Sequence, residues 1–342
     1  MQARRHVTLE DVARAADVSL ATASRALNGM RVTPHLRERV LLAAERLAYT
    51  PNAHARALAG GAHRTVGVVC HDVSDPYFAA IAGGVMRVAA DNDLLVMLAS
   101  TFSDPEREIA YVSMLRAERA HAILLIGSGF EDLHWERALE AELKPYLDGR
   151  GRVAVISRHR SLRVDTVLPE NRAGAAAMAR AMLEMGHRRF AVLTGPPVLT
   201  TVADRLGGFR AELRKAGVRL AAADIVEGPF TRDGGYAAMT RLLDQGTRAT
   251  CVFAVADVMA IGACAAVRDR GLSVPNDVSI AGFDDIPIVR DLTPPLTTVA
   301  LPLQQLGERA LELALTENPE RRRRVLRMGG EVVVRASTAK LA

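Results

Sequence analysis

The stretch SLATASRALNG, residues 19–29, decides how the first part of the chain folds. Ser19 is a residue type that caps the start of a helix, and the Asn28-Gly29 pair is a good left-handed stop. The eight residues between them are therefore predicted to form one short helix. The helical repeat divides the side chains into an inward set, Val18, Ala23 and Leu27, and an outward set, Leu20, Ala21 and Arg25.

The outward set has a composition that suits a nucleic-acid groove better than water. Arg25 can donate two hydrogen bonds to one guanine, and Leu20 and Ala21 can contact the methyl group of thymine. The alternative interpretation is an ordinary amphipathic helix with a structural role only.

Two further helices are predicted around this one. Thr8 can cap a helix over LEDVARAA, with Asp11 favoured in the first turn. Thr33 and Pro34 begin a third helix, in which the apolar residues at positions 36, 40, 43, 44 and 47 share one face. Two short helices joined by a tight turn and followed by a longer helix form a helix-turn-helix, in which the first residues of the second helix face base edges.

Positive charge is concentrated at the same end of the chain. The net charge of +5 lies entirely in residues 1–64, which hold ten arginines, no lysine and five acidic residues. The rest of the chain is neutral overall. A one-sided excess of this kind is typical of a DNA-binding head joined to a neutral body, although a solvated basic face would also produce it.

From residue 65 onward, short β-type runs alternate with helical stretches. The β-type runs include TVGVVC, HAILLI, RVAVIS, RFAVLTG and TCVFAV, and helical stretches such as RAGAAAMARAMLEMG lie between them. This alternation predicts an α/β body of parallel sheets covered by helices on both faces, and its length allows two such sheets. Neither GxGxxG nor GxxxxGK[ST] occurs, so no nucleotide cofactor is predicted.

Other classes of protein are disfavoured. No segment has the pattern of a secretory signal, and the most apolar window, residues 250–267, is predicted to be a buried strand and a helix rather than a membrane span. Three scattered cysteines in apolar surroundings predict reduced thiols in a cytoplasmic protein. No Ser or Cys stands at a known spacing from a His and an acid, so an enzyme is not expected. A solute-binding protein would need export and would lack the basic head.

Several motifs, in order along the chain, are similar to those of the lactose-repressor (LacI) family of bacterial transcription regulators. The first are VTLEDVARAADVSLATASRALNG and YTPNAHARALAGG, and the series continues with TVGVVCHDVSDPYF, NRAGA, MGHRRFAVLTGPP, VPNDVSIAGFDD, TPPLTTV and VVVRAST. The resemblance implies a homodimeric repressor that binds pseudo-palindromic operator DNA under the control of a small polar effector. Whether dimers pair into tetramers, and whether the effector releases or promotes DNA binding, is left open.

The resemblance assigns residues 1–50 to a helix-turn-helix DNA-binding domain and residues 51–64 to a hinge helix and linker. The hinge helix is expected to fold on the operator, with Leu58 as a wedge in the minor groove and Ala59 leaving room at the central step. Leu20, Ala21 and Arg25 are expected to set base choice. The remaining DNA contacts are predicted for Thr8, Ser19, Thr22, Asn28, Arg31 and Asn52.

The resemblance also implies a periplasmic-binding-protein-like core over residues 65–342. Its two parallel-sheet subdomains are joined by three crossovers and enclose an effector cleft. The first subdomain is expected at about 65–160 and 300–327, and the second at about 161–299 and 328–342.

Eight residues are predicted to line this cleft. Arg205 offers five donors and Asp284 an acceptor, which together suit a carboxylate or vicinal hydroxyls. The alternative is that the two form only a structural ion pair across the cleft. An apolar face would come from Tyr77 and Phe78. The predicted set is Tyr77, Phe78, Ser157, Thr201, Arg205, Ala256, Asp284 and Leu301.

Three of these positions depart from the family's pattern. Ala256 stands where an Asn is common, Leu301 where a polar residue such as Gln is common, and Ser157 where an acid is common. Each sugar hydroxyl left without a partner would cost about 1–3 kcal/mol, so a smaller or less hydroxylated molecule than a hexose is predicted, with an acid held by Arg205 as one candidate. Loss of effector control is the alternative. The charge run PERRRRV, residues 319–325, is interpreted as a solvated loop rather than a second DNA contact.

Overall fold

A computed structural model describes residues 7–28, 30–49, 65–127, 129–319 and 322–341. The chain divides into two compact units, Met1–Arg64 and Thr65–Ala342, here called the head and the body. Each unit is described by itself.

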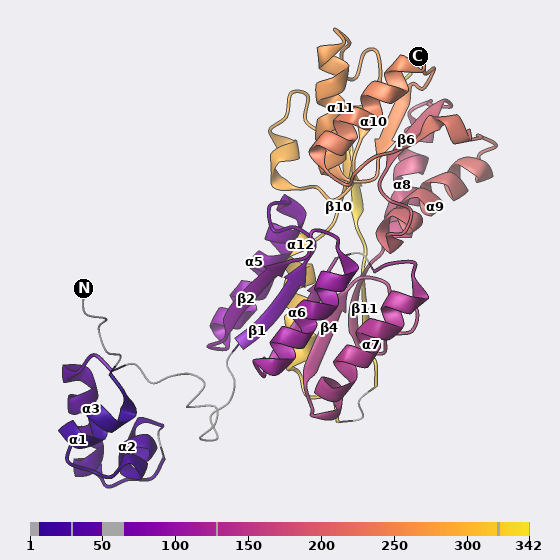
Figure 1. The fold of residues 1–342 in the computed structure, drawn as a ribbon. Helices are drawn as coiled ribbons and strands as arrows, with labels where there is room; N and C mark the ends of the chain where they lie inside the picture. The colour runs from indigo at the N-terminus through magenta and orange to yellow at the C-terminus, as the bar shows by residue number, and fades with distance from the viewer. Residues whose placement is uncertain (1–6, 29, 50–64, 128, 320–321, 342) are drawn as a thin grey trace. The chain divides into compact units, whose positions relative to one another are not determined.

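The described part of the head is three helices, α1 (Leu9–Ala15), α2 (Leu20–Leu27) and α3 (Pro34–Arg46), as Figure 1 shows. Both predicted caps are confirmed. The Thr8 hydroxyl accepts a hydrogen bond from the Asp11 amide at 3.3 Å, and the Ser19 hydroxyl accepts one from the Thr22 amide at 3.1 Å. These caps satisfy amide groups that the first turn of a helix leaves without partners.

A small apolar core holds the three helices together. Val12 of α1, Ala23 of α2 and Val40 of α3 are fully buried in it. The Arg39 side chain of α3 donates a hydrogen bond to the Ala16 carbonyl at 2.6 Å, which fastens α3 to the turn between α1 and α2. The apolar faces predicted for the second and third helices are therefore the faces that pack.

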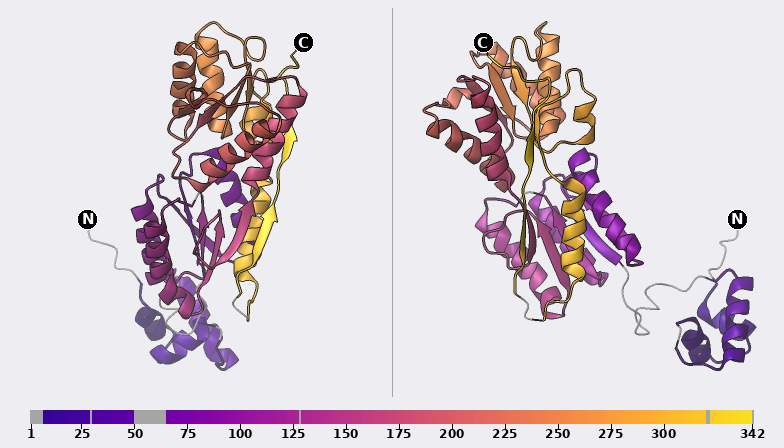
Figure 2. Two further views of the ribbon diagram at one scale, coloured as in Figure 1. Left: turned by 90° about the vertical axis from the view of Figure 1, so that its right-hand side faces the viewer. Right: turned by 180° about the vertical axis from the view of Figure 1, so that it is seen from behind.

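The first sheet of the body has six parallel strands in the order β11-β5-β4-β3-β1-β2. Helices α5 and α12 pack on one face of it and α6 and α7 on the other (Figures 1 and 2), which is why its central strands are apolar throughout. The elements are β1 (Thr65–Cys70), α5 (Pro76–Asp91), β2 (Leu95–Ser100), α6 (Pro105–Ala117), β3 (Ala122–Ile126), α7 (Leu133–Asp148), β4 (Arg152–Ile156), β5 (Asp165–Pro169), α12 (Leu303–Leu315) and β11 (Val325–Met328).

The second sheet has four parallel strands in the order β7-β6-β8-β9, with helices α8 and α9 against each other and α10 and α11 against each other (Figure 2). A separate antiparallel pair, β10 and β12, lies where the chain passes between the two sheets. The elements are α8 (Asn171–Glu184), β6 (Phe190–Thr194), α9 (Thr200–Lys215), η1 (Ala222–Asp224), β7 (Ile225–Glu227), α10 (Arg232–Asp244), β8 (Cys251–Ala254), α11 (Asp257–Asp269), β9 (Ser279–Ala281), η2 (Pro287–Arg290), β10 (Thr298–Ala300) and β12 (Glu331–Val333).

The predicted α/β body with two parallel sheets is confirmed, but the first crossover lies later than expected. Strand β5 pairs in parallel with β4 and with β11, so residues 165–169 belong to the first sheet. The sequence analysis instead expects the second subdomain to begin near residue 161. Strand β5 is only five residues long, and its pairing with β4 on one side and β11 on the other assigns it to the first sheet.

The apolar window at residues 250–267 folds as predicted, with strand β8 followed by helix α11. Among the described residues, no helix has both the length and the apolar character that a membrane span requires.

Glu108, on α6, is a buried carboxyl group that makes the first sheet sensitive to pH. It is 7% exposed, and burial raises its pKa from 4.5 to about 8. Between these values the unfolded chain has lost a proton that the folded chain keeps, so stability falls as pH rises. We expect Glu108→Gln to remove this loss. Urea denaturation of both proteins at pH 5 and pH 8 measures it, and parallel pH dependences would contradict the assignment.

Candidate functional site

The outward face of α2 is the first candidate site. Leu20 is 46% exposed, and Ala21 and Arg25 are exposed beside it. The Arg25 Nε group donates to the Ala21 carbonyl at 3.2 Å, which directs the side chain along the helix surface toward the α2 N-terminus. The three side chains thus share one exposed surface, as the helical repeat predicts.

The polar residues around this face fix the two helix starts. The Ser19 and Thr22 hydroxyls lie 2.8 Å apart, and Thr8 and Asp11 form a reciprocal capping box. Asn28 donates to the Ser24 hydroxyl at 3.3 Å at the other end of α2. Arg31 is exposed in the following loop. An anion is favoured at the N-terminus of a helix, so Thr8, Ser19 and Thr22 suit phosphate contacts through their helix starts, and the exposed Arg31 suits one through its charge.

Three residues predicted for DNA binding lie outside the described residues. They are Asn52, Leu58 and Ala59.

Arg205 of α9 is the centre of the second candidate site. It is 1% exposed, and four of its five N–H groups are engaged. Nε donates to the Asn171 side chain at 2.9 Å, one Nη to the Val255 carbonyl at 2.6 Å, and both Nη atoms to the two Asp284 oxygens at 3.2 and 2.6 Å. Its guanidinium carbon lies 3.9 Å from the centre of the Phe283 ring. The group is a fixed donor with little freedom to move.

Asp284 reaches Arg205 through an unusual backbone. Its φ is 120° and that of Asp285 is 54°, both in the region that side chains other than glycine rarely adopt. Asp257 anchors this loop, because its two oxygens accept hydrogen bonds from the Ile286 amide at 3.0 Å and the Thr298 hydroxyl at 2.6 Å. Two successive positive φ values therefore point a carboxylate at the guanidinium.

Arg205 and Asp284 belong to the same subdomain, which corrects the picture of an ion pair across the cleft. Arg205 lies on α9, Asp284 follows β9, and both elements are part of the second sheet's layer. The Asp285 side chain forms ion pairs with other partners, Arg290 at 2.8 Å and Arg335 at 2.7 Å. The adjacent carboxylates therefore do not share a partner.

Residues of the first subdomain sense this pair electrostatically. Burial raises the pKa of Tyr77, Asp284 raises it further, and Arg205 lowers it. Asp75 caps α5, and burial likewise raises its pKa. The hydrogen bond that it accepts from the Tyr77 amide and the charge of Arg205 both act to lower this pKa. Phe78 is buried next to Tyr77, with ring centres 5.0 Å apart. The pKa values of Asp75 and Tyr77 at the start of α5 thus respond to the charge of Arg205.

Ser157 is buried at the carboxyl end of β4, and its hydroxyl lies 2.7 Å from Nε2 of His159. Glu136 lies behind the imidazole, with 3.6 Å between its carboxylate and Nδ1. Burial acts to raise the pKa of Glu136, but the nearby His159 side chain and hydrogen bonds from the Ser161 and Arg160 amides bring it to about 2. The 3.6 Å separation is longer than a hydrogen bond, and the buried serine already has His159 as its partner.

The other predicted cleft residues differ in what they offer. Ala256 and Leu301 are buried and apolar, at 1% and 6% exposure. Thr201 is half-buried in the first turn of α9. This turn contacts the first subdomain, because the Thr200 amide donates to the Gly129 carbonyl at 2.8 Å.

Several residues that build this site were not predicted from the sequence. Asn171 and Asp257 hold Arg205 and the Asp284 loop, and His159 satisfies Ser157. A usable signal existed for Asn171, which begins the motif NRAGA, and for Asp257, which follows Ala256 directly after strand β8. No pattern pointed to His159.

Comparisons with known proteins match both units of the chain to known families. A model of "Bacterial regulatory proteins, lacI family" matches residues 8–52, and one of a "Periplasmic binding protein-like domain" matches residues 179–338. The HTH-type transcriptional regulator GalS of Salmonella typhimurium is 35% identical over 90% of this chain and 89% of its own length. The ribose operon repressor of Haemophilus influenzae is 32% identical over 98% of this chain and 99% of its own.

Solved structures show the same architecture. The crystal structure of the lac repressor dimer bound to operator and the anti-inducer ONPF has a TM-score of 0.83 at 25% identity, over 98% of this chain and all of that one. The complex of the transcriptional regulator CelR with cellobiose has a TM-score of 0.69 at 28% identity, over 97% of this chain and all of that one. With full-length relatives above 30% identity, the chain belongs to the LacI family of bacterial transcription regulators.

Proposed function

We propose that this chain is a cytoplasmic, homodimeric repressor that reads a pseudo-palindromic operator through α2 and responds to a small polar effector bound by the body. The observation that carries the DNA-reading role is the exposed face of Leu20, Ala21 and Arg25 on a capped helix, in the part of the chain that holds all of the excess positive charge. The relatives are named as regulators and repressors rather than enzymes.

Arg25→Ala tests this role. We expect it to weaken operator binding by about 1–3 kcal/mol and to relax the preference at one base pair in each half-site, because a bidentate contact with guanine is lost. Fluorescence anisotropy on an operator selected from a random duplex library, and on its single-base variants, measures both effects.

Arg14→Ala is the matched control, because this exposed arginine lies on α1 and, among the described residues, forms an ion pair only with Asp11, at 3.5 Å. It removes the same charge without touching the proposed reading face. Equal weakening by Arg25→Ala on every sequence would reject base reading.

The hinge proposal rests on the family resemblance and on residues 51–64. Two copies of Leu58 would wedge at the centre of the operator, where Ala59 leaves room, and the hinge helix would form only on DNA. The phosphate contacts proposed for Thr8, Ser19, Thr22, Asn28 and Arg31 would hold the head in register.

The effector is proposed to bind between the start of α5 and the Arg205–Asp284 pair. Ala256 and Leu301 offer no hydrogen bonds, and Ser157 is already bonded to His159, so a heavily hydroxylated sugar would lack partners. Asp284 neutralises Arg205, which makes an acidic effector the weaker candidate. We therefore favour a small, sparsely hydroxylated molecule. Titration calorimetry of the full chain tests this, because tight hexose binding would contradict it.

The homodimer is supported by an exposed apolar surface on the first subdomain. Strand β2 is an edge strand of the first sheet, and it exposes Leu95 by 68% and Met97 by 42%. Met86 of α5 is 45% exposed. Large exposed apolar side chains on an open edge are typical of a subunit interface.

A further inference from the structure

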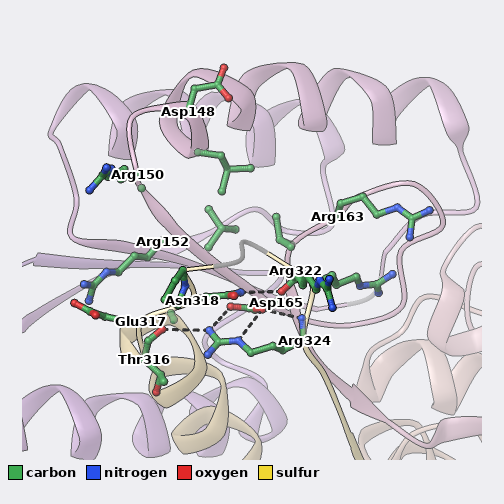
Figure 3. A pocket seen from close by; sticks show the side chains of 17 residues that line it. Asp148, Arg150, Arg152, Arg163, Asp165, Thr316, Glu317, Asn318, Arg322 and Arg324 are labelled. Carbon is green, nitrogen blue, oxygen red and sulfur yellow. Dashed lines mark hydrogen bonds and ion pairs between the residues drawn. The ribbon is translucent and has the colours of Figure 1, made fainter.

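A cavity of about 640 Å³ lies at the end of the first sheet where β4, β5 and β11 begin (Figure 3). Because the sheet is parallel, β1 also begins at this end of the sheet. The cavity is far from the Arg205 site, which lies beyond the carboxyl ends of the strands. Its charged lining consists of Arg150, Arg152, Arg163, Arg322, Arg323 and Arg324, against Asp148, Asp165 and Glu317.

Only part of this positive charge is neutralised within the cavity. Arg324 forms a bidentate pair with Asp165, with distances of 3.1 and 2.5 Å, which Figure 3 shows at the centre of the view. Asp148 is 3.0 Å from Lys144, which does not line the cavity. Glu317 is then the one remaining lining carboxylate beside Arg150, Arg152, Arg163 and Arg323.

Two of these arginines are fixed by neutral partners. Arg152 donates to His121 at 3.2 Å and to the Leu315 carbonyl at 3.1 Å. Arg323 donates to the Thr166 hydroxyl through two nitrogens, each at 3.2 Å. Both side chains are half-buried. Such bonds hold a guanidinium in place without cancelling its charge, so the positive potential of the cavity is preorganised.

Two further arginines stand on the rim. Arg150 and Arg163 are exposed and extend from different sides of the cavity (Figure 3). Neither guanidinium group forms a hydrogen bond or an ion pair with any residue that the structure describes. Their donors are available to a bound anion.

We propose that this cavity binds a ligand carrying two or more phosphate groups. The guanidinium group forms paired hydrogen bonds to phosphate oxygens, and the volume suits a small molecule. The phosphates can come from a soluble phosphorylated compound or from a DNA backbone, since both present the same chemistry. Within the charge run, Arg322, Arg323 and Arg324 are then part of a site rather than of a solvated loop only.

The first test uses the full chain and inorganic tripolyphosphate. We expect calorimetry to detect binding and the Arg150→Gln/Arg163→Gln variant to weaken it at least tenfold. The control is Arg214→Gln/Arg248→Gln, which removes two exposed arginines of the second subdomain that also lack ion pairs with described residues. No binding by the native chain, or equal weakening in both variants, would overturn the proposal.

The second test separates the two sources of phosphate. Binding of a random 40-base-pair duplex is measured across a range of salt concentrations for the native chain and both variants. If DNA supplies the phosphates, the cavity variant will lower the salt slope by about two relative to the control variant. If a soluble compound supplies them, the cavity variant and the control will bind DNA alike while only the cavity variant loses tripolyphosphate.

Discussion

Gly84→Ala will destabilise the body by about 2–3 kcal/mol, the upper part of the range for overpacking a core. Helices α5 and α12 pack so closely that a Cβ atom at Gly84 would lie 2.0 Å from the Gln304 carbonyl oxygen. The contact is reciprocal, because a Cβ atom at Gly307 would lie 2.0 Å from the Ile81 carbonyl oxygen. Both obstacles are backbone atoms, so the helices must separate to accept the methyl group. Chemical denaturation of the two proteins measures the difference.

Gly83→Ala is the matched control in the same helix. A Cβ atom there has no neighbour within 4 Å, so the substitution should stabilise the protein by about 0.5–1 kcal/mol through helix propensity. If Gly84→Ala lowers the free energy of unfolding and Gly83→Ala raises it, the close packing of α5 on α12 is the cause of the loss. A similar loss at both positions would show that the effect does not come from this helix contact.

The same helix pair marks the limit of what the sequence predicts about the fold. Alternating β-type runs and helical stretches predict two parallel sheets, because residues along one element decide that pattern. Which elements pair is decided by contacts between distant segments, as with α5 and α12. Strands β7, β10 and β12 have three residues each and carry no pattern of their own. The sequence also places residues 165–169 in the second subdomain, because the pairing of β5 with β4 and β11 depends on distant segments.

The two candidate sites differ in how far the sequence predicts them. The outward face of α2 follows from a capping serine and the helical repeat, and both are local. The sequence predicts that Arg205 and Asp284 act together, and only the alternative interpretation makes them an ion pair across the cleft. Their actual geometry depends on positive φ values at 284 and 285 and on the Asp257 anchor. The positive φ values are not visible in a single sequence, and the position of Asp257 directly after strand β8 does not show which loop it holds. Ser157 and His159 both lie in the loop that follows β4, where no periodic pattern in the sequence predicts that their side chains meet.

Arg205→Met will have the largest effect of the substitutions considered, a loss of about 3–5 kcal/mol in the free energy of unfolding. The change leaves Asp284 buried at 4% exposure without its cation. Arg180→Met is the control, because Arg180 forms an ion pair with Glu212 from a side chain that is 57% exposed, and such pairs contribute at most about 1 kcal/mol. Urea denaturation at pH 8 compares the two variants.

Dependence on pH identifies the cause of the loss. Burial already raises the pKa of Asp284 from 3.8 to about 7 beside Arg205, which lowers it, so the pKa must rise further without the arginine. A raised pKa in the folded state means that stability increases as pH falls toward 3.8, where the unfolded chain also binds the proton. The deficit of Arg205→Met should therefore shrink between pH 8 and pH 5. A deficit that is constant with pH would mean that lost packing on Phe283, rather than the stranded carboxylate, causes it.

Arg205→Met/Asp284→Asn then separates stability from effector binding. Asparagine tolerates a positive φ and carries no charge, so the double variant should recover most of the lost stability and show no deficit that varies with pH. A thermal-shift screen of small polar compounds identifies those that stabilise the native chain. If the Arg205–Asp284 pair also contacts the effector, these compounds will not stabilise the double variant, although its own stability is restored. If the double variant keeps that stabilisation, the pair serves only to hold the loop at residues 283–286, and the effector is recognised elsewhere in the body.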